Sequence, residues 1–313
     1  MSTWLRPLLE TLLLAGLAPL ATGLLRWFKA HLQNRQGPPL LQPYRDLLKL
    51  LAKQPLVPEP SSWIFRAAPY IGFAAIVVAA AIVPVLSIPS PLTALGDVIV
   101  LAALFALARF FTALAALDTG TPFGGMGASR EMSIASLAEP AMLMAIFVLS
   151  LAAHSTNLSV MIDSTLNAGL VLRPSVAFAL IAMVLVALAE TGRLPVDNPA
   201  THLELTMIHE AMVLEYSGRY LALIEWAQQI KLLLFVTLIL NLFAPWGIAD
   251  AAGDWWIALV AWVLKVVALL GLLGVLETTV AKMRIFRVPE YLGAAFAIGM
   301  LGMLTHFILE VGV

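Results

Sequence analysis

The sequence predicts an all-α membrane protein with about eight transmembrane helices, and three observations support this fold class. Of the 313 residues, 61% are apolar and only 12% are charged. Several apolar runs reach the ~20 residues that a helix needs to cross the hydrocarbon core of a bilayer. The basic residues gather in the segments between these runs. We therefore interpret residues 1–313 as a single integral membrane domain.

The predicted spans are apolar runs bounded by charged or turn-forming residues. The first run is too long for a secretory signal sequence, and its positive charges follow it rather than precede it, so we expect it to remain as a span. The eight spans lie at about residues 5–28, 67–87, 97–117, 138–154, 174–190, 225–244, 255–280 and 291–311.

Lysine and arginine are distributed unevenly between the two sides of these spans. Of the 18 such residues, 13 fall in loops at about 26–66, 118–137, 191–224 and 281–290, whereas only Arg6 and Arg173 fall on the other side. Loops rich in lysine and arginine stay in the cytoplasm. We therefore predict that these four loops are cytoplasmic, and an even number of spans then places both termini outside.

Composition excludes several classes of function. The net charge is −1, with no basic patch of the kind that binds nucleic acid. Cysteine is absent, which excludes disulfides, cysteine-ligated iron–sulfur clusters and thiol catalysis in this chain. We predict no metal site, because on a helix His202 and His209 would lie about 10 Å apart, too far to share one ion. Any redox centre of an associated reaction must belong to another chain.

Residues 187–226 carry an unusual concentration of charge for so apolar a chain. Six carboxylates fall within these 40 residues. Ionisable groups in or beside a bilayer are costly, and they often mark an ion path or a docking surface. The alternative is a solvated loop helix with ordinary surface charge. Asn198 and Pro199 predict the start of a helix of about 17 residues ending at Tyr216, on which Glu204 and Glu215 would share a face, about 16 Å apart.

Charged residues also fall inside predicted spans. Arg109 lies in the third span and needs a carboxylate, a carbonyl or a water-filled cavity as its partner. Glu139 lies at the head of the fourth span. Lys231 would lie about 9 Å into the sixth span and Lys265 about 15 Å into the seventh, near the middle of the membrane. In the first loop, the spacing of leucines over residues 40–51 predicts a short amphipathic helix at the membrane surface.

Three segments resemble the membrane subunit that anchors the peripheral arm of respiratory complex I, known as complex I subunit 1. They read QGPPLLQPYRDLLKLL, GASREMSIASLAEP, and AETGRLPVDNPA followed by LE and LEYSG. They are more similar still to the counterpart in formate hydrogenlyase and in hydrogenase-4-type membrane-bound nickel–iron (NiFe) hydrogenases. The resemblance covers nearly the whole chain.

This resemblance implies an eight-helix subunit with tilted helices in the cytoplasmic membrane of a bacterium or archaeon. Its cytoplasmic loops would hold the hydrogenase small and large subunits, and its flank would contact antiporter-like membrane subunits. No cofactor is expected on this chain. The NiFe centre and iron–sulfur clusters would belong to the partner subunits. The subunit would couple their redox reaction to proton or sodium translocation.

Two groups of residues are assigned from the charged positions and this resemblance together. The expected proton-relay and coupling residues are Glu139, Glu190, Asp197, Glu204, Glu215, Lys231 and Lys265. The residues expected to dock the partner arm are Arg45, Asp46, Lys49, Arg130, Glu131, Arg193 and Arg219.

The sequence also departs from the complex I pattern. Ala200 and His202 stand where acids would be expected, and Pro39-Leu40 replaces the Asn-Arg that is typical of the first loop in complex I. These departures favour the hydrogenase branch and argue against a quinone site. A quinone-site subunit of an NADH–quinone oxidoreductase is the alternative hypothesis, and a stand-alone transporter is a third.

Overall fold

The computed structural model describes residues 5–88, 92, 95–168, 173–197, 207–249 and 255–310. Within these ranges the chain is helical, and its β-structure amounts to two isolated bridges, Ser87 with Ala249 and Asp97 with Asn157. The longer helices are α1 (Leu5–Leu32), α2 (Gln42–Leu51), α3 (Trp63–Ile82), α4 (Val98–Asp118), α5 (Pro122–Ala153), α6 (Leu158–Ala168), α7 (Pro174–Glu190), α9 (Gly218–Phe243), α10 (Trp255–Thr279) and α11 (Val288–Thr305). The short elements are α8 (His209–Val213), η2 (Ile285–Arg287) and η3 (His306–Glu310).

The predicted fold class is confirmed. Seven helical segments of the described chain are long and apolar enough to cross a membrane: α1, α3, α4, α5, α9, α10 and Ile285–Leu309. The remaining expected span is α7, an apolar helix of 17 residues. All eight predicted spans therefore coincide with helices.

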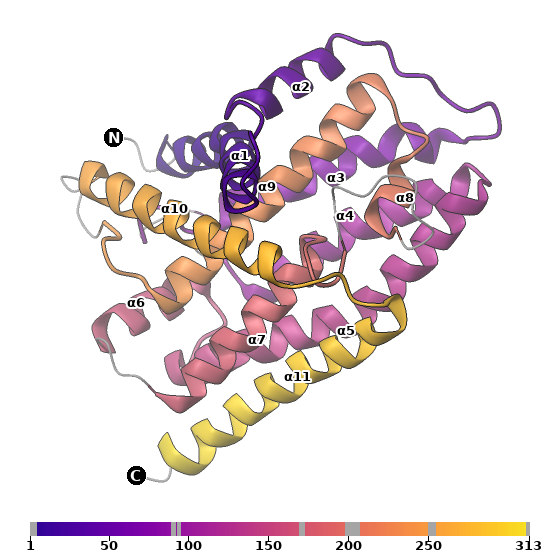
Figure 1. Cartoon of the computed structure of the whole chain (residues 1–313). Helices are drawn as coiled ribbons and strands as arrows, with labels where there is room; N and C mark the ends of the chain where they lie inside the picture. The colour runs from indigo at the N-terminus through magenta and orange to yellow at the C-terminus, as the bar shows by residue number, and fades with distance from the viewer. Residues whose placement is uncertain are drawn as a thin grey trace.

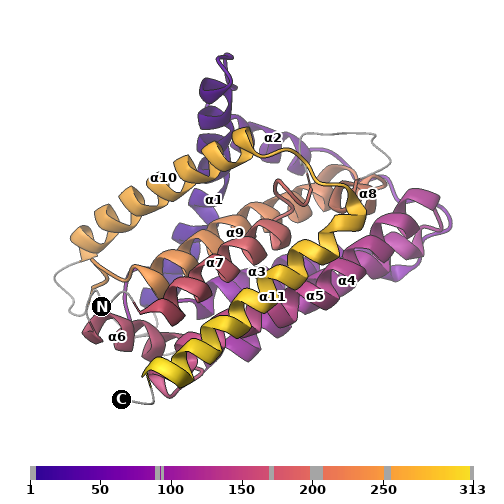
Figure 2. The same ribbon diagram turned by 60° about the horizontal axis from the view of Figure 1, so that its bottom comes forward.

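The helices form a tilted bundle with two distinct ends (Figures 1 and 2). α5, α7 and α11 pack together along their lengths, α3 packs against α4 and α9, and α10 packs chiefly against α1. The start of α1 and the end of α11 lie towards the same end as α6, whereas α8 lies at the opposite end (Figure 1). We call the end with α8 the loop end.

The core is centred on α9, which is buried on nearly every side. From Ile230 to Leu242 its residues are all buried, and the Phe235 ring stacks on Phe105 of α4 with ring centroids 5.1 Å apart. A helix that is apolar all round is typical of the centre of a membrane bundle. Lys231 is the one charged residue in this stretch, which makes its surroundings informative.

The first loop contains the amphipathic helix that the leucine spacing predicts. α2 packs on α9 and α1, with Leu47 buried and Leu48 exposed. Gly23 of α1 makes the close approach possible, because a Cβ at this position would lie 2.2 Å from the Leu40 carbonyl oxygen. The helix therefore lies against the bundle and keeps one apolar face uncovered.

The segment 118–137 differs from the expected loop, because α5 begins at Pro122 and runs for 32 residues. The Thr121 side chain accepts a hydrogen bond from the Gly124 amide, and proline suits the first turn of a helix. Glycine is a poor helix former, but packing explains its use here. A Cβ on Gly127 would lie 2.9 Å from Ala211 Cβ of α8, so glycine allows α5 and α8 to meet.

The helix predicted from Pro199 to Tyr216 is only partly open to comparison. Residues 198–206, including His202 and Glu204, lie outside the described residues. Among the described residues that follow, only His209–Val213 are helical, so the prediction that the helix runs to Tyr216 is wrong. Gly218, with φ +55°, then allows a sharp turn into α9.

Candidate functional site

Arg109 of α4 is the centre of a buried charge cluster. Its guanidinium hydrogen-bonds Glu190 at the end of α7 and Glu139 of α5, and its Nε lies 3.4 Å from Glu131 Oε1. The Arg109 side chain is 5% exposed and that of Glu190 is 1% exposed. The prediction that Arg109 needs a carboxylate, a carbonyl or a water-filled cavity as its partner is confirmed, because three carboxylates contact it. The partners come from two other helices, so the cluster also joins α4, α5 and α7.

Lys231 completes the cluster from α9. Its Nζ donates to Glu190 Oε2 at 2.8 Å, and it lies near the faces of Phe105 and Phe235, 5.7 and 6.0 Å from the ring centroids. We use the term charge cluster for Arg109, Glu131, Glu139, Glu190 and Lys231. Two cations face three carboxylates, so the cluster carries one excess negative charge when every group is ionised.

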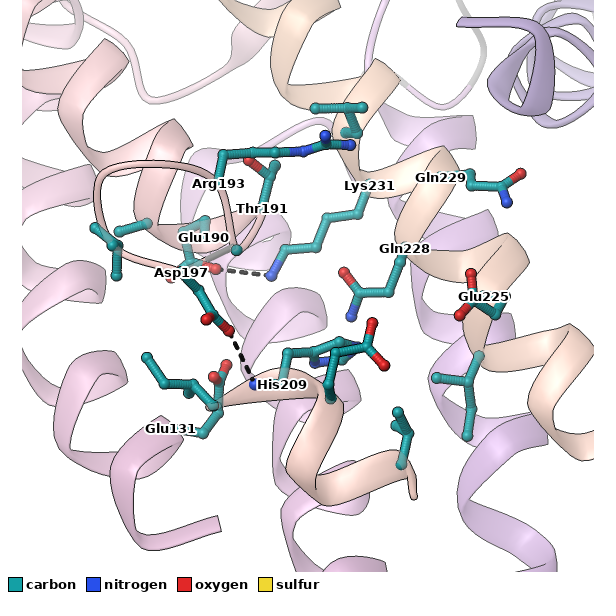
Figure 3. A pocket seen from close by; sticks show the side chains of 18 of the residues that line it. Glu131, Glu190, Thr191, Arg193, Asp197, His209, Glu225, Gln228, Gln229 and Lys231 are labelled. Carbon is teal, nitrogen blue, oxygen red and sulfur yellow. Dashed lines mark hydrogen bonds and ion pairs between the residues drawn. The ribbon is translucent and has the colours of Figure 1, made fainter. Parts of the chain in front are cut away.

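A polar cavity of about 180 Å³ adjoins the charge cluster (Figure 3). Its wall includes Glu131, Glu190 and Lys231 from the cluster. A polar cavity needs roughly 10–15 Å³ for each water, so this one has room for several. Buried Gln229 Oε1 lines the cavity and has no hydrogen-bond partner among the described residues, and buried polar atoms of this kind are normally satisfied by water. The cavity is therefore suited to a water chain.

A second polar group borders the cavity at the loop end of the bundle. Asp197 Oδ2 accepts a hydrogen bond from the His209 amide at 3.4 Å (Figure 3). The other oxygen of Asp197 lies 3.3 Å from Lys282 Nζ. Glu210, Glu225 and Gln228 also line the cavity. Titratable side chains thus line the cavity both at the charge cluster and at the loop end, with apolar residues such as Ile134 and Ile208 also in its wall.

Arg193, three residues after the end of α7, also lines the cavity. Gly192, with φ +59°, turns the chain directly after the helix. Arg193 Nη1 then lies 3.4 Å from Glu277 of α10, and Lys29 of α1 pairs with the other oxygen of the same carboxylate. Burial lowers the pKa of Arg193 below its usual value, whereas the charge of Glu277 opposes this shift. This ion triad joins α1, α10 and the loop after α7.

The structure brings together four of the expected coupling residues. Glu139, Glu190 and Lys231 belong to the charge cluster, and Asp197 lies across the cavity. Glu215 is exposed, and Glu204 lies outside the described residues. Lys265 lies apart from the cluster. Its Nζ donates to the carbonyl oxygens of Ala244 and Trp246, 3.0 and 2.8 Å away, where the chain leaves α9.

The expected docking residues divide into exposed and inward-facing groups. Arg45, Lys49 and Arg219 are exposed, and Asp46 accepts a hydrogen bond from Gln42 within α2. Arg130 donates to the Met207 carbonyl oxygen. Glu131 and Arg193, in contrast, line the polar cavity.

Sequence reasoning missed several residues of the site. Lys29 and Glu277 form the ion triad, and His209, Gln228 and Gln229 line the cavity. Periodicity could not select these residues, because their contacts join segments far apart in the sequence. Glu10 of α1 was also missed. It is buried near the other end of the bundle, where its carboxylate accepts hydrogen bonds from the Val85 and Leu86 amides.

Among the described residues, no group of three or more histidine, aspartate or glutamate side chains is arranged to hold a metal ion. The arrangement is instead suited to moving charge. Arg109 contacts three carboxylates, so a shift of its side chain would change the stability of a proton on each of them. The site offers titratable groups, a cavity for water and a group whose pairing can change.

A family model described as NADH dehydrogenase matches residues 7–308. Formate hydrogenlyase subunit 4 of Escherichia coli (strain K12) is 36% identical over 303 residues, covering 96% of this chain and 98% of the relative. Hydrogenase-4 component C of the same organism is 35% identical, covering 94% and 93%. A subunit of the NADH-quinone oxidoreductase of Thermomicrobium roseum is 30% identical, covering 79% of each chain.

A solved structure has the same fold. It is a chain in the structure of the membrane-bound sulfane sulfur reductase, an archaeal respiratory membrane complex. The TM-score is 0.82 with 20% sequence identity, and the match covers 97% of this chain and 99% of the other.

Proposed function

Because this chain belongs to the NADH dehydrogenase subunit 1 family, we propose that it is the membrane-anchor and coupling subunit of a hydrogenase complex of the formate hydrogenlyase or hydrogenase-4 type. It would hold a peripheral redox arm at its loop end and link the reaction there to proton or sodium movement. It would have no redox centre of its own. Those centres, NiFe and iron–sulfur, would belong to the hydrogenase small and large subunits.

The observation that carries this proposal is the contact between the charge cluster and the polar cavity. A proton cannot cross bare hydrocarbon, so a relay needs titratable groups joined by water. Glu190 meets both conditions, since it hydrogen-bonds Arg109 and Lys231 and lines the cavity. A redox change in a docked arm would act through the loop after α7, which follows Glu190 directly.

The test uses the whole complex, purified by a tag on this chain and reconstituted in sealed vesicles. Glu190→Gln keeps the shape of the side chain but cannot release a proton. We expect the redox activity of the arm with artificial acceptors to persist, and gradient-dependent activity to fall at least tenfold. Glu59→Gln, a change of an exposed carboxylate in the first loop, should leave both activities unchanged. Normal ion movement in assembled Glu190→Gln complexes would leave this subunit with an anchoring role only.

The same purification distinguishes the alternative functions. The proposed role predicts that hydrogenase small and large subunits and antiporter-like membrane subunits come with this chain. The quinone-site subunit of an NADH–quinone oxidoreductase would come with the other subunits of that enzyme, and its activity would depend on added quinone. A stand-alone transporter would purify alone and move a solute.

The proposed orientation has its own test. Thirteen basic residues in the four loops, against two on the other side, favour a cytoplasmic loop end. Reporter fusions after Lys53 and Val288 should give cytoplasmic signals, and fusions after Ser90 and Val313 should give external ones. A cytoplasmic signal after Val313 would contradict the orientation.

A further inference from the structure

An apolar slot of about 70 Å³ lies between α7, α9 and α10, away from the charge cluster. It extends from Val184 to Thr191 on α7 and from Leu269 to Leu276 on α10. Seven residues at 1.5 Å each give a length of about 10 Å. α10 leans away from α7 in this region because it packs chiefly against α1. The slot is the space that this separation leaves.

The wall of the slot suits a hydrocarbon chain rather than a polar ligand. Thr191 is the one polar residue among the described residues that line it, and its hydroxyl donates to the Ala187 carbonyl oxygen at 2.6 Å. A ligand with carbonyl or hydroxyl groups would lose its hydrogen bonds to water here without replacement, which is costly. A saturated chain has no such cost.

The slot is open at the side that faces lipid. Leu272 of α10 forms its lip and is 55% exposed, and the neighbouring face of α10 is apolar and exposed at Leu264 and Val275. The three helices that line the slot are membrane spans, so the medium beside its open side is the acyl region of the bilayer. An acyl chain can enter from the side without passing through water.

Basic residues gather at one end of the slot. Thr191 and Leu276 mark this end. Within two residues of them in the sequence are Arg193 and Glu277 of the ion triad, in which two cations face one carboxylate. After α10, the segment 281–287 adds exposed Arg284 and Arg287 and no acid, whereas its Lys282 pairs with Asp197. Phe286 in the same segment is 88% exposed. Such a combination of cations and an exposed aromatic ring is typical of the lipid headgroup level.

We propose that this slot binds one acyl chain of an anionic phospholipid, with the headgroup at the basic end beside residues 281–287. The occupant is a lipid of the same leaflet as the loop end. It fills the gap between α7 and α10 and so adds to the packing of α10, which otherwise rests chiefly on α1 and on the ion triad at this end.

The first experiment maps the site in the intact complex. The complex is placed in vesicles of phosphatidylcholine that contain a small fraction of either phosphatidylglycerol or phosphatidylcholine with a photoreactive diazirine in one acyl chain. After illumination, labelled peptides are identified by mass spectrometry. We expect the phosphatidylglycerol probe to label slot residues of α7 and α10 several-fold more than exposed residues of α11, and more than the phosphatidylcholine probe does. Equal labelling of the slot and α11, or by the two probes, would overturn the proposal.

The second experiment changes the site. Leu272→Trp adds bulk at the lip of the slot, where the side chain is already exposed, and Arg284→Gln removes an exposed cation from the basic end. The matched controls are Ala294→Phe on the exposed face of α11 and Arg66→Gln at the start of α3. Phosphatidylglycerol that remains with each purified complex is counted by mass spectrometry. We expect about one lipid per chain in the controls and at least a threefold loss in both slot variants. Retention equal to the controls would overturn the proposal.

Discussion

Lys231 and Lys265 look alike in the sequence, because each is a single lysine within a long apolar helix, yet their surroundings differ completely. Lys231 contacts a buried carboxylate at the edge of a polar cavity, near two aromatic rings. Lys265 donates to two backbone carbonyl oxygens where the chain leaves α9. The first lysine has a titratable neighbour. The second donates to carbonyl groups just past the end of α9, where no helical amide is available as a donor.

The comparison teaches that a similar place within an apolar helix does not give two lysines similar partners. The sequence predicts Lys265 near the middle of a span and therefore in the relay. Its amino group instead has neutral acceptors, and within the described part of the chain no carboxylate pairs with it. A relay needs a neighbour that can gain or lose a proton, and only Lys231 of the two has one.

The largest expected effect comes from removing the carboxylate that makes Lys231 different. Glu190→Ala leaves Arg109 and Lys231 buried without their shared partner, and such a change costs about 3–5 kcal/mol. We expect most of the complex to fail assembly, measured as the amount that co-purifies with this chain. The double variant Glu190→Gln/Lys231→Gln removes one charge of each sign and should assemble better than Glu190→Ala. Equal losses in the two would show that packing rather than charge balance is at stake.

Exchanging each lysine for methionine tests the comparison directly. Lys231→Met removes a member of the charge cluster, so we expect gradient-dependent activity to fall about tenfold or more while activity with artificial acceptors persists. Lys265→Met should leave gradient-dependent activity within about twofold of the unchanged complex. A loss of ion movement in Lys265→Met would contradict this comparison and support the predicted relay role of Lys265.

A smaller effect is expected on the stability of Lys265→Met. The change removes two hydrogen bonds to carbonyl groups, and an unsatisfied buried acceptor costs about 1–3 kcal/mol. Because Lys265 is partly exposed, the lower end of this range applies. The prediction is a lower melting temperature of the purified complex, followed by the intrinsic fluorescence of its tryptophans. An unchanged melting temperature would mean that water or lipid headgroups replace the lost donor.

The smallest effect is expected on the exposed surface of the helix that carries Lys231. Arg219 lies near the start of α9, is exposed, and faces the Tyr220 ring at 5.6 Å. Arg219→Glu should reduce retention of the peripheral arm on washed membranes by a few-fold, and more at low salt than at high salt. Arg66→Glu, at an exposed position on α3, is the control. Full retention at low salt would remove Arg219 from the docking surface.

The sequence predicted the fold well because membrane helices are fixed by local properties. Apolar length alone located the eight helices, since every span must satisfy its own backbone hydrogen bonds. The loop between the third and fourth spans was harder. Residues 118–137 were predicted as a loop, but α5 begins at Pro122, and close packing of Gly127 against α8 favours a helix there. Tertiary contact overrides local propensity at this position.

The candidate site was predictable only in part. The need of Arg109 for a polar partner followed from the cost of a buried charge. The identity of that partner did not, because Glu190 is 81 residues away in the sequence. For the same reason Glu277 could be read as a residue near a helix end, whereas it pairs with Lys29 and Arg193 from two other segments. Charge cost predicts that a pair exists, and only the packed chain decides which residues form it.

The position of the polar cavity also has an electrical consequence. Under the proposed orientation, water in the cavity would bring the potential of the cytoplasm inward as far as Glu190. The transmembrane voltage would then fall mainly across the dry part of the bundle beyond α9, towards buried Glu10. An elementary charge that crosses the full voltage gains or loses about 2.3 kcal/mol per 100 mV. A charge that leaves Glu190 for the outer side would therefore do nearly all of its electrical work in that remaining distance.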